Sequence, residues 1–175
     1  SLADVGAHKL GEYPGTPRND GSNIVDEKYN ESIFVGYRWT DKEKITPLFP
    51  FGHGLSYTSY KYGKAVIDKN IMGDDEVLTV TVPITNIGMR AGSEIVQMYI
   101  SDLKSSLPRP VKELKGFQKL YLKAGEKKSL TFVLTEEDLA FCGADMKMQV
   151  EPGEFRLWVG TSSADERNES VFTLI

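Results

Sequence analysis

The chain has 175 residues, of which 40% are hydrophobic and 26% charged, a composition typical of a soluble globular protein. Its formal net charge of −4 argues against a nucleic-acid-binding protein, which would carry a basic face. No apolar run approaches the roughly 20 residues needed to cross a bilayer, and the single cysteine, Cys142, excludes an internal disulfide.

The first 31 residues are polar and rich in turn formers, with no sustained hydrophobic period of 2 or 3.6 residues. A loop of this length is unusual inside a compact domain, so we expect a tail, a linker or a piece of another domain. The sequence opens Ser1-Leu2-Ala3, without a methionine or a signal segment. We therefore expect that something upstream has been removed.

Residues 33–39, IFVGYRW, are nearly continuous in apolar and aromatic side chains and predict a short strand. A strand of this kind is typical of a parallel α/β sheet, in which both faces of each strand are buried. Nothing else in the chain could supply the neighbouring helices and strands. This mismatch indicates that the segment comes from an incomplete domain.

Residues 47–58, PLFPFGHGLSYT, combine two prolines and several aromatic side chains with the glycines Gly52 and Gly54. Rigid, aromatic, glycine-hinged chain of this kind is compatible with an active-site loop, a hinge between domains or a structural plug. The residues alone leave these three alternatives open.

From residue 55 onward the pattern predicts an all-β domain. Strands are expected over 78–85, 96–100, 116–122, 130–134, 155–159 and 171–175, with a short helical turn near 135–139 for which Thr135 is the N-cap. We expect Pro83 on an edge strand, or with its missing N–H pointing outward. About seven short strands separated by turns predict an antiparallel sandwich of the immunoglobulin or fibronectin type III kind.

Few residues suggest chemistry. Two acidic runs, Asp74-Asp75-Glu76 and Glu136-Glu137-Asp138, could in principle supply the pair of carboxyls that glycoside hydrolysis needs. Both runs fall in turns or at strand ends, where acidic side chains are usually solvated, and we favour that interpretation. His8 and His53 lie too far apart in sequence for a zinc motif. Cys142 is best interpreted as a small, partly buried residue and not as a nucleophile.

Aromatic residues offer one further possibility. Trp39 and Trp158 could stack on sugars, and Trp158 alternates with the inward-facing residues of its strand, so it is expected to face solvent or a neighbouring domain. Packing against a partner domain is the interpretation we favour. Asn30 and Asn168 each fit the short glycosylation sequon. From the residues alone, the chain has a fold and no catalytic centre.

A family resemblance rests on four long stretches: YNESIFVGYRWTDKEKITPLFPFGHGLSYTSYKYG (29–63), AGSEIVQMYISD (91–102), RPVKELKGFQKLYLKAGEKKSLTFVLTEEDLAF (109–141) and VEPGEFRLWVGTSS (150–163). They resemble, in order and in spacing, the C-terminal part of glycoside hydrolase family three, the β-glucosidase and β-xylosidase group. The closest likeness is to large bacterial β-glucosidases.

The resemblance implies a barrel domain, then an α/β sandwich domain, then a fibronectin type III-like domain. Residues 1–50 would be the tail of the α/β sandwich domain and its linker, and residues 51–175 the fibronectin type III-like domain. The fold class is then mainly β, with an N-terminal segment left over from an α/β domain. Residues 47–58 would form the structural hinge between them. The sequence departs from the family's frequent residues at Ser32, often glycine, and near Met148, often tryptophan.

The resemblance also implies that catalysis lies elsewhere. In the family the nucleophilic aspartate belongs to the barrel domain, and the acid/base glutamate lies in or near the α/β domain. We therefore assign no catalytic, cofactor-binding or metal-binding residue and no cofactor to this chain, and expect it to be inactive alone. Its implied partners are the upstream barrel and α/β sandwich domains and an oligosaccharide, with no nucleic acid and no membrane span. A periplasmic or extracellular location is expected.

Two alternatives to an accessory domain of a retaining, exo-acting β-glucosidase remain. A carbohydrate-binding module would need a row of exposed aromatic side chains, for which Trp158, Tyr99 and Tyr121 are candidates that need not share a face. A plain adhesion or spacer domain would have no use for the N-terminal extension. In addition, apolar residues left exposed in the isolated chain predict self-association: Phe34, Tyr37, Trp39 and Phe49.

Overall fold

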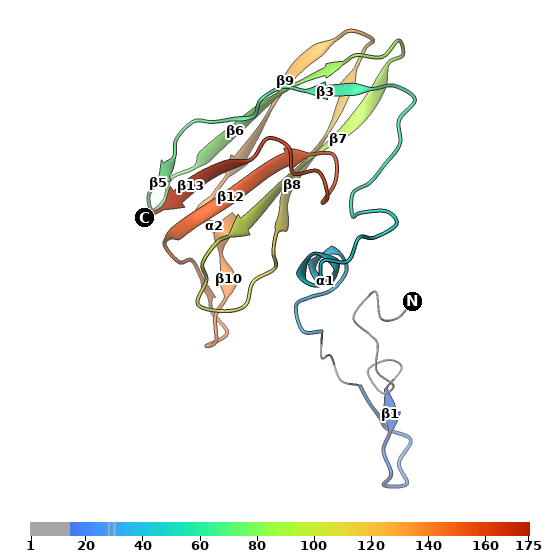
Figure 1. Cartoon of the computed structure of the whole chain (residues 1–175). Helices are drawn as coiled ribbons and strands as arrows, with labels where there is room; N and C mark the ends of the chain where they lie inside the picture. Colours follow the sequence, from blue (N-terminus) through green and yellow to red (C-terminus); the bar gives the residue numbers. More distant parts are fainter. Residues whose placement is uncertain (1–14, 28, 30) are drawn as a thin grey trace. The chain divides into compact units, whose positions relative to one another are not determined.

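The computed structural model describes residues 15–27, 29 and 31–175, which form two compact units divided between Phe49 and Pro50 (Figure 1). In the first unit, β1 (Thr16–Pro17) and β2 (Val25–Asp26) form a short antiparallel hairpin. The Arg18 guanidinium lies 2.6 Å from the Asp26 carboxylate and holds the two strands together. Apart from this ladder, the described residues up to position 31 lack regular structure, as their composition predicts.

The strand predicted over residues 33–39 is wrong, because the chain there turns into the short helix α1 (Tyr37–Lys42). Gly36 has a φ of 62° and precedes the helix, whose first turn is closed by the Trp39 N–H donating to the Gly36 carbonyl at 3.1 Å. A strand needs a neighbouring strand for its backbone hydrogen bonds, and no described residue supplies one. A helical turn satisfies those groups locally.

Local contacts also change the expected exposure of this region. Phe49 is exposed as predicted, but Phe34, Tyr37 and Trp39 are half-buried. The Lys42 ammonium lies 4.1 Å from the centre of the Phe34 ring and 5.5 Å from that of Trp39. The helix therefore covers part of the apolar surface that the sequence leaves unpartnered.

The backbone at Ser32 accounts for the glycine that is frequent in the family, and nothing in the structure explains the serine. Ser32 has a φ of 54°, in the left-handed region that favours glycine. A glycine would adopt this conformation without the steric cost of a side chain.

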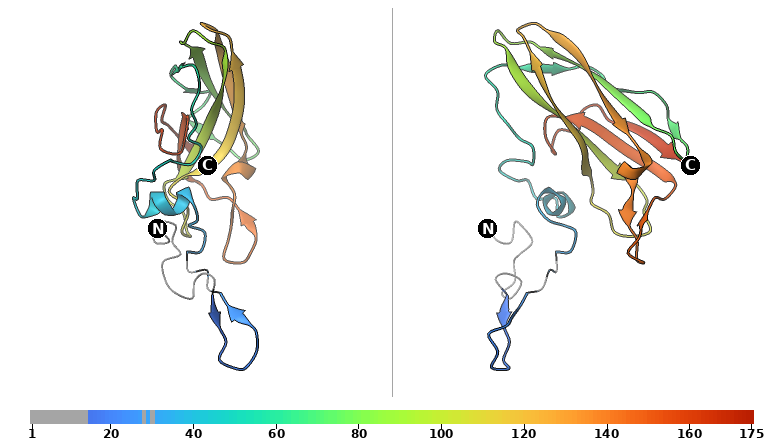
Figure 2. Two further views of the ribbon diagram at one scale, coloured as in Figure 1. Left: turned by 90° about the vertical axis from the view of Figure 1, so that its right-hand side faces the viewer. Right: turned by 180° about the vertical axis from the view of Figure 1, so that it is seen from behind.

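The second unit is a sandwich of two β-sheets, which Figure 2 shows edge-on. Five strands form one sheet in the order β5 (Ile71–Met72), β13 (Ser170–Leu174), β12 (Gly153–Gly160), β7 (Gly92–Asp102) and β8 (Glu113–Leu122). In the other, β6 (Leu78–Asn86) pairs along one side with β9 (Lys127–Leu134) and along the other with β3 (Tyr60–Tyr62) and β4 (Val66–Ile67). The remaining elements are α2 (Glu136–Leu139) and the hairpin of β10 (Phe141–Cys142) and β11 (Met148–Gln149).

This architecture confirms the predicted sandwich. Every strand pairing is antiparallel except that of β13 with β5, which the sequence did not predict. The alternating residues predicted to face inward are buried, and they pack between the two sheets: Leu78, Val80, Val82, Ile84, Val96, Met98, Ile100, Leu130, Phe132, Leu134, Phe155, Leu157 and Val159. The rings of Phe155 and Phe172 stack at 5.4 Å within this core.

Pro83 lies in the middle of β6 and not on an edge strand. Its carbonyl accepts a hydrogen bond from the Gly63 N–H at 2.8 Å, in the gap between β3 and β4. In a strand the N–H and C=O of one residue point to the same side, so the missing N–H of Pro83 also faces this gap. The proline is tolerated because the neighbouring ladder is interrupted there.

Candidate functional site

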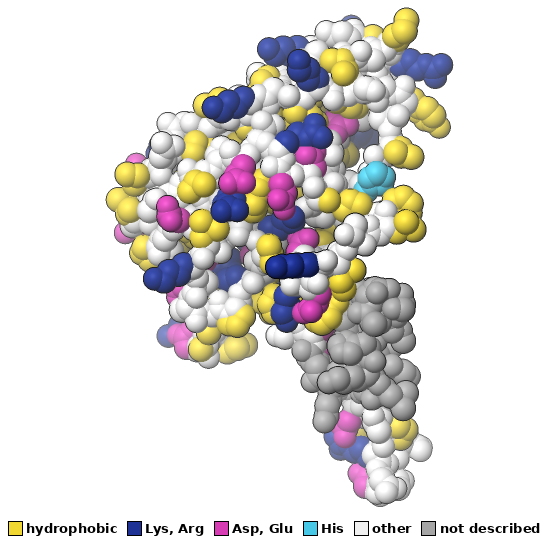
Figure 3. Space-filling model, in the orientation of Figure 1, with side chains coloured by type: hydrophobic (Ala, Val, Ile, Leu, Met, Phe, Trp, Pro, Cys, Tyr) yellow, Lys and Arg dark blue, Asp and Glu magenta, His cyan; other side chains and the backbone are white. Residues whose placement is uncertain are grey.

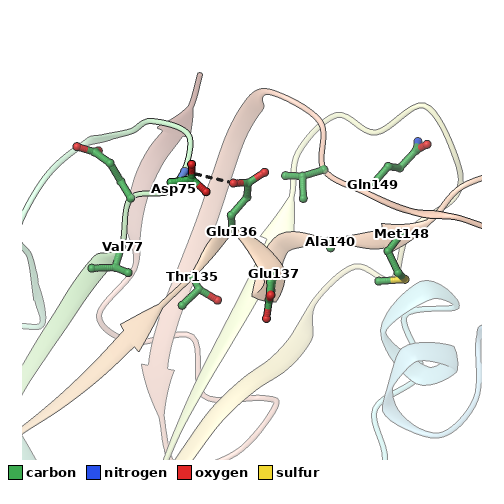
Figure 4. Close-up of a pocket in the computed structure, with 10 residues that line it drawn as sticks. Asp75, Val77, Thr135, Glu136, Glu137, Ala140, Met148 and Gln149 are labelled. Atoms are coloured by element: carbon green, nitrogen blue, oxygen red, sulfur yellow. Dashed lines mark hydrogen bonds between the residues drawn. The ribbon is translucent and has the colours of Figure 1, made fainter.

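The two acidic runs singled out in the sequence come together around one shallow pocket, about 650 Å³ in volume (Figure 4). The Asp75 N–H donates to the Glu136 carboxylate at 3.4 Å, which joins the turn before β6 to the start of α2. Met148, where the family often has tryptophan, is exposed and lines the same pocket.

Two carboxylates of the acidic runs, Glu76 and Asp138, are engaged in a turn and in a helix cap. Glu76 accepts hydrogen bonds from the Gly73 N–H (3.0 Å) and the Lys69 ammonium (3.2 Å), and these bonds lower its pKa. Asp138 accepts from the Thr135 N–H (2.9 Å) and hydroxyl (3.1 Å), which caps α2 as Thr135 was predicted to do. A general acid needs a raised pKa, usually from burial. The geometry therefore favours the structural interpretation.

Glu137 does not complete an acid–base pair either. Figure 4 shows its side chain pointing away from Asp75 and Glu136. Retaining chemistry needs two carboxyls that flank one glycosidic bond about 5–5.5 Å apart, and a side chain that points away from the other carboxylates does not suit that arrangement. That the chain contributes no catalytic residue stays a prediction.

Histidine and cysteine offer no metal site among the residues that the structure describes, which contain no group of three potential ligands. His8 lies outside those residues, and so does the sequon asparagine Asn30. Cys142 is exposed, and the prediction that it is partly buried is wrong, because its neighbour Phe141 takes the inward position of β10. The other sequon residue, Asn168, accepts a hydrogen bond from the Ala65 N–H at 3.2 Å.

Trp158, which was expected to face solvent or a neighbouring domain, is buried within the second unit itself. Trp158 is 5% exposed and lies opposite Tyr99, which is 1% exposed, in the pairing of β12 with β7. The buried Lys112 ammonium lies 5.9 Å from the indole ring and pairs with Glu166 at 2.8 Å. Trp158 and Tyr99 therefore share a face, but neither is available to a sugar.

The side chain of Gln97 attaches the segment 50–58 to the face of the sheet that carries Tyr99 and Trp158. Its amide nitrogen donates to the carbonyls of Gly52 (3.0 Å) and Thr161 (2.6 Å), and its amide oxygen accepts from the Tyr99 hydroxyl (2.6 Å). The Ser163 N–H adds a bond to the Phe51 carbonyl at 2.9 Å. Because Gln97 is buried, these partners are what make its burial favourable.

A second anchor holds the other end of the segment. The Asn86 side chain is buried and accepts from the Thr58 hydroxyl at 2.7 Å and the Gly88 N–H at 3.0 Å. Its amide nitrogen donates to the carbonyls of Arg90 (2.7 Å) and Leu122 (3.2 Å). Asn86 thus joins the end of the segment to the turn after β6 and to the end of β8.

Between these anchors the segment presents apolar side chains to solvent. Leu55 is 94% and Tyr57 93% exposed, and Figure 3 shows hydrophobic side chains gathered around the histidine on this face of the second unit. A plug would bury these groups, and a mobile tail would lack the anchors. Firmly held, exposed apolar residues are typical of an interaction surface.

Sequence reasoning missed both anchoring residues. Gln97 is a polar residue between the inward-facing Val96 and Met98, and Asn86 directly follows the strand expected over 78–85. A polar residue within an apolar strand is the one available signal, and it does not identify a partner.

The loop after β12 that supplies Thr161 is itself held by Asp165. The Asp165 carboxylate accepts from the Thr161 N–H (3.0 Å) and hydroxyl (2.9 Å) and from the Arg167 guanidinium (2.6 Å). Burial raises the pKa of Asp165, but these hydrogen bonds outweigh it and leave the pKa below its usual value.

We predict that Gly52→Ala destabilises the sandwich by about 1–3 kcal/mol from backbone strain alone, because Gly52 has a φ of 80°. The added Cβ would also lie 2.0 Å from the Gln97 amide oxygen. The matched control is Gly54→Ala, whose Cβ would meet nothing within 4 Å. Urea unfolding followed by tryptophan fluorescence measures both. Equal free energies of unfolding for the two variants would contradict the anchoring of Gly52 by Gln97.

We predict that Asp165→Asn destabilises the protein more at neutral pH than in acid. The folded-state pKa of Asp165 is lowered, so its stabilising effect is present above the unfolded pKa and disappears as the pH falls through the folded pKa. Burial raises the pKa of Glu94, which gives the opposite slope, so the variant must be compared with the parent chain at each pH. Asp145→Asn, at the exposed β10–β11 turn, is the control. A difference that does not change with pH would refute this assignment.

Comparison with known proteins identifies relatives of this chain. A fibronectin type III-like domain model matches residues 94–163. Thermostable beta-glucosidase B of Acetivibrio thermocellus is 48% identical over 165 residues, which cover 94% of this chain and 22% of the relative. The periplasmic beta-glucosidase of Salmonella typhimurium is 43% identical over 118 residues, 67% of this chain and 15% of that protein.

The solved structures agree with the sequence relatives. DesR, a β-glucosidase from Streptomyces venezuelae solved with D-glucose, has a TM-score of 0.83 and 36% identity over 98% of this chain and 21% of that one. The chain thus spans about a fifth of the length of such relatives. No helix among its described residues is long and apolar enough to cross a membrane. The chain belongs to glycoside hydrolase family three, as a C-terminal portion that contains its fibronectin type III-like domain.

Proposed function

We propose that this chain braces the catalytic domains of a retaining, exo-acting β-glucosidase, which hydrolyses terminal β-glycosides. The observation that supports this most strongly is the segment 50–58. It is held at both ends by buried amides, yet it exposes Leu55 and Tyr57 almost completely. Such a surface suits a neighbouring domain of the same protein, which would cover the two side chains.

The relatives support the activity of the whole enzyme. They are named β-glucosidases, and the chain matches only about a fifth of their length, which leaves most of each relative for other domains. Retaining hydrolysis needs a carboxylate nucleophile and a carboxylic acid. We place both in the preceding barrel and α/β sandwich domains, since Asp138 and Glu76 of the two acidic runs serve as cap and turn partners.

The domain assignment follows from the same proposal. Residues 1–50 are the tail of the α/β sandwich domain with its linker, and residues 51–175 the fibronectin type III-like domain. The partners are the preceding domains and, for the whole enzyme, an oligosaccharide. A periplasmic or extracellular location is supported by the relative from Salmonella typhimurium, which is named periplasmic.

The test is the double substitution Leu55→Ser, Tyr57→Ser in the complete gene product. We expect its melting temperature to fall by several degrees, because burying each side chain against a neighbouring domain contributes about 1.5–3 kcal/mol. The 175-residue chain with the same substitutions should keep its melting temperature, since both side chains are exposed in it. The control is Met146→Ser, a similarly exposed residue of the β10–β11 turn.

Turnover of an aryl β-glucoside is measured alongside. The complete product should hydrolyse it, and the 175-residue chain should not. An unchanged melting temperature in the complete product would refute bracing through this segment. Turnover by the 175-residue chain would refute the placement of the catalytic carboxylates upstream.

A further inference from the structure

β8 is an edge strand of the five-stranded sheet (Figure 1). Its outward face carries a second group of exposed apolar side chains. Phe117 is 66% and Tyr121 55% exposed, and they are the two exposed aromatic side chains on the strands that the structure describes. Residues four apart in a strand share a face and lie about 13 Å apart. The two rings therefore lie along one line on one side of the sheet.

The pairing of β8 with β7 adds a third member between them. Phe117 lies opposite Gln97, Lys119 opposite Ile95, and Tyr121 opposite Ser93. Ile95 is exposed and is the diagonal neighbour of both aromatic residues. We call Phe117, Ile95 and Tyr121 the aromatic strip.

The orientation of the strip is set by the opposite face of β8. Gly116 faces the core, where an added Cβ would lie 2.9 Å from the Phe132 ring, and Leu122 is fully buried. Because successive side chains alternate, Phe117 and Tyr121 must point outward.

Hydrogen bonds to the neighbouring strand β9 hold the strand that carries the two aromatic rings. The Tyr121 carbonyl accepts from the Lys128 ammonium at 3.2 Å, and the Gln118 amide donates to the Thr131 carbonyl at 2.7 Å. These bonds tie β8 to β9 in addition to its ladder with β7. A platform already ordered before binding loses little conformational entropy when it takes up a ligand.

The size and surroundings of the strip favour a sugar over a protein. A stable interface with a separate protein buries about 800 Å² on each partner, far more than three side chains supply. A pyranose ring has one face of C–H groups that packs on an aromatic ring and a rim of hydroxyls that seek polar groups. The strip offers two rings, with the exposed Lys119 and the half-buried Ser93 beside them.

We propose that the aromatic strip is a binding site for a β-linked oligosaccharide or polysaccharide chain, whose sugar rings stack on Phe117 and Tyr121. The spacing of the rings requires a chain of several sugars, not a monosaccharide. This inference rests on the proposed function, because it supposes that the whole enzyme acts on β-glycosides. The strip would hold the polymer near the enzyme while other domains cleave its end.

The test is affinity electrophoresis of the 175-residue chain in native gels that contain barley β-glucan, laminarin or xylan. We expect at least one polysaccharide to slow its migration. Phe117→Ala and Tyr121→Ala should each weaken binding about tenfold or more, whereas Tyr121→Phe should retain it because the ring remains. Val171→Ala, a half-exposed residue on the outward face of β13 in the same sheet, is the matched control and should change nothing. Melting temperatures show whether each variant is folded.

Two outcomes in the chain would overturn the proposal: no retardation by any of the three polysaccharides, or retardation that both alanine variants retain. The complete gene product is then run in the same gels. Loss of retardation there would also overturn it, and would mean that a preceding domain covers the strip. Failure of the bracing function can be distinguished from failure of sugar binding. Bracing is measured by the melting temperature of the Leu55, Tyr57 variant, and sugar binding by the gels.

Discussion

The way the chain enters the sandwich depends on one buried amide. Gln97 has partners from three separate parts of the sequence: Gly52, Tyr99 and Thr161. A buried amide is unfavourable unless both its nitrogen and its oxygen are hydrogen-bonded, so these three parts must assemble together. Because of this requirement, residues 50–52 are part of the folded unit and not a free connecting loop. It also leaves Gly52 no room for a side chain.

This constraint divides the outer face of the five-stranded sheet into two parts. Around β12 the face is closed by loops, and buried Trp158, Tyr99 and Lys112 form a polar layer that has a structural role. At the edge strand β8 the same face is open, and Phe117 and Tyr121 remain exposed. On the outer face of this sheet, the part around β12 stabilises the fold and the part at β8 carries the proposed sugar-binding strip. The inner face supplies the apolar core.

The acidic residues show a comparable division between chemistry and structure. Two carboxylate runs meet at one pocket, as a glycosidase centre would require, but Glu76 and Asp138 are occupied by turn and cap hydrogen bonds. Retaining glycoside hydrolysis needs one carboxylate as nucleophile and one carboxyl as acid and base, whereas Glu76 and Asp138 serve in turn and cap hydrogen bonds. Such use suits an accessory domain, whose contribution is the position and stability of its neighbours.

The sequence by itself determined the sandwich, its inward-facing residues and the Thr135 cap, because period-2 alternation and capping are local properties of a chain. Three features were decided only by the tertiary structure. Residues 33–39 do not form their predicted strand, because none of the residues that the structure describes supplies a strand to pair with them. Trp158 proved buried, and Gln97 an anchor, because alternation identifies the two faces of a strand but not what covers the outer one. That covering comes from loops distant in sequence, and contacts of this kind leave no periodic signal.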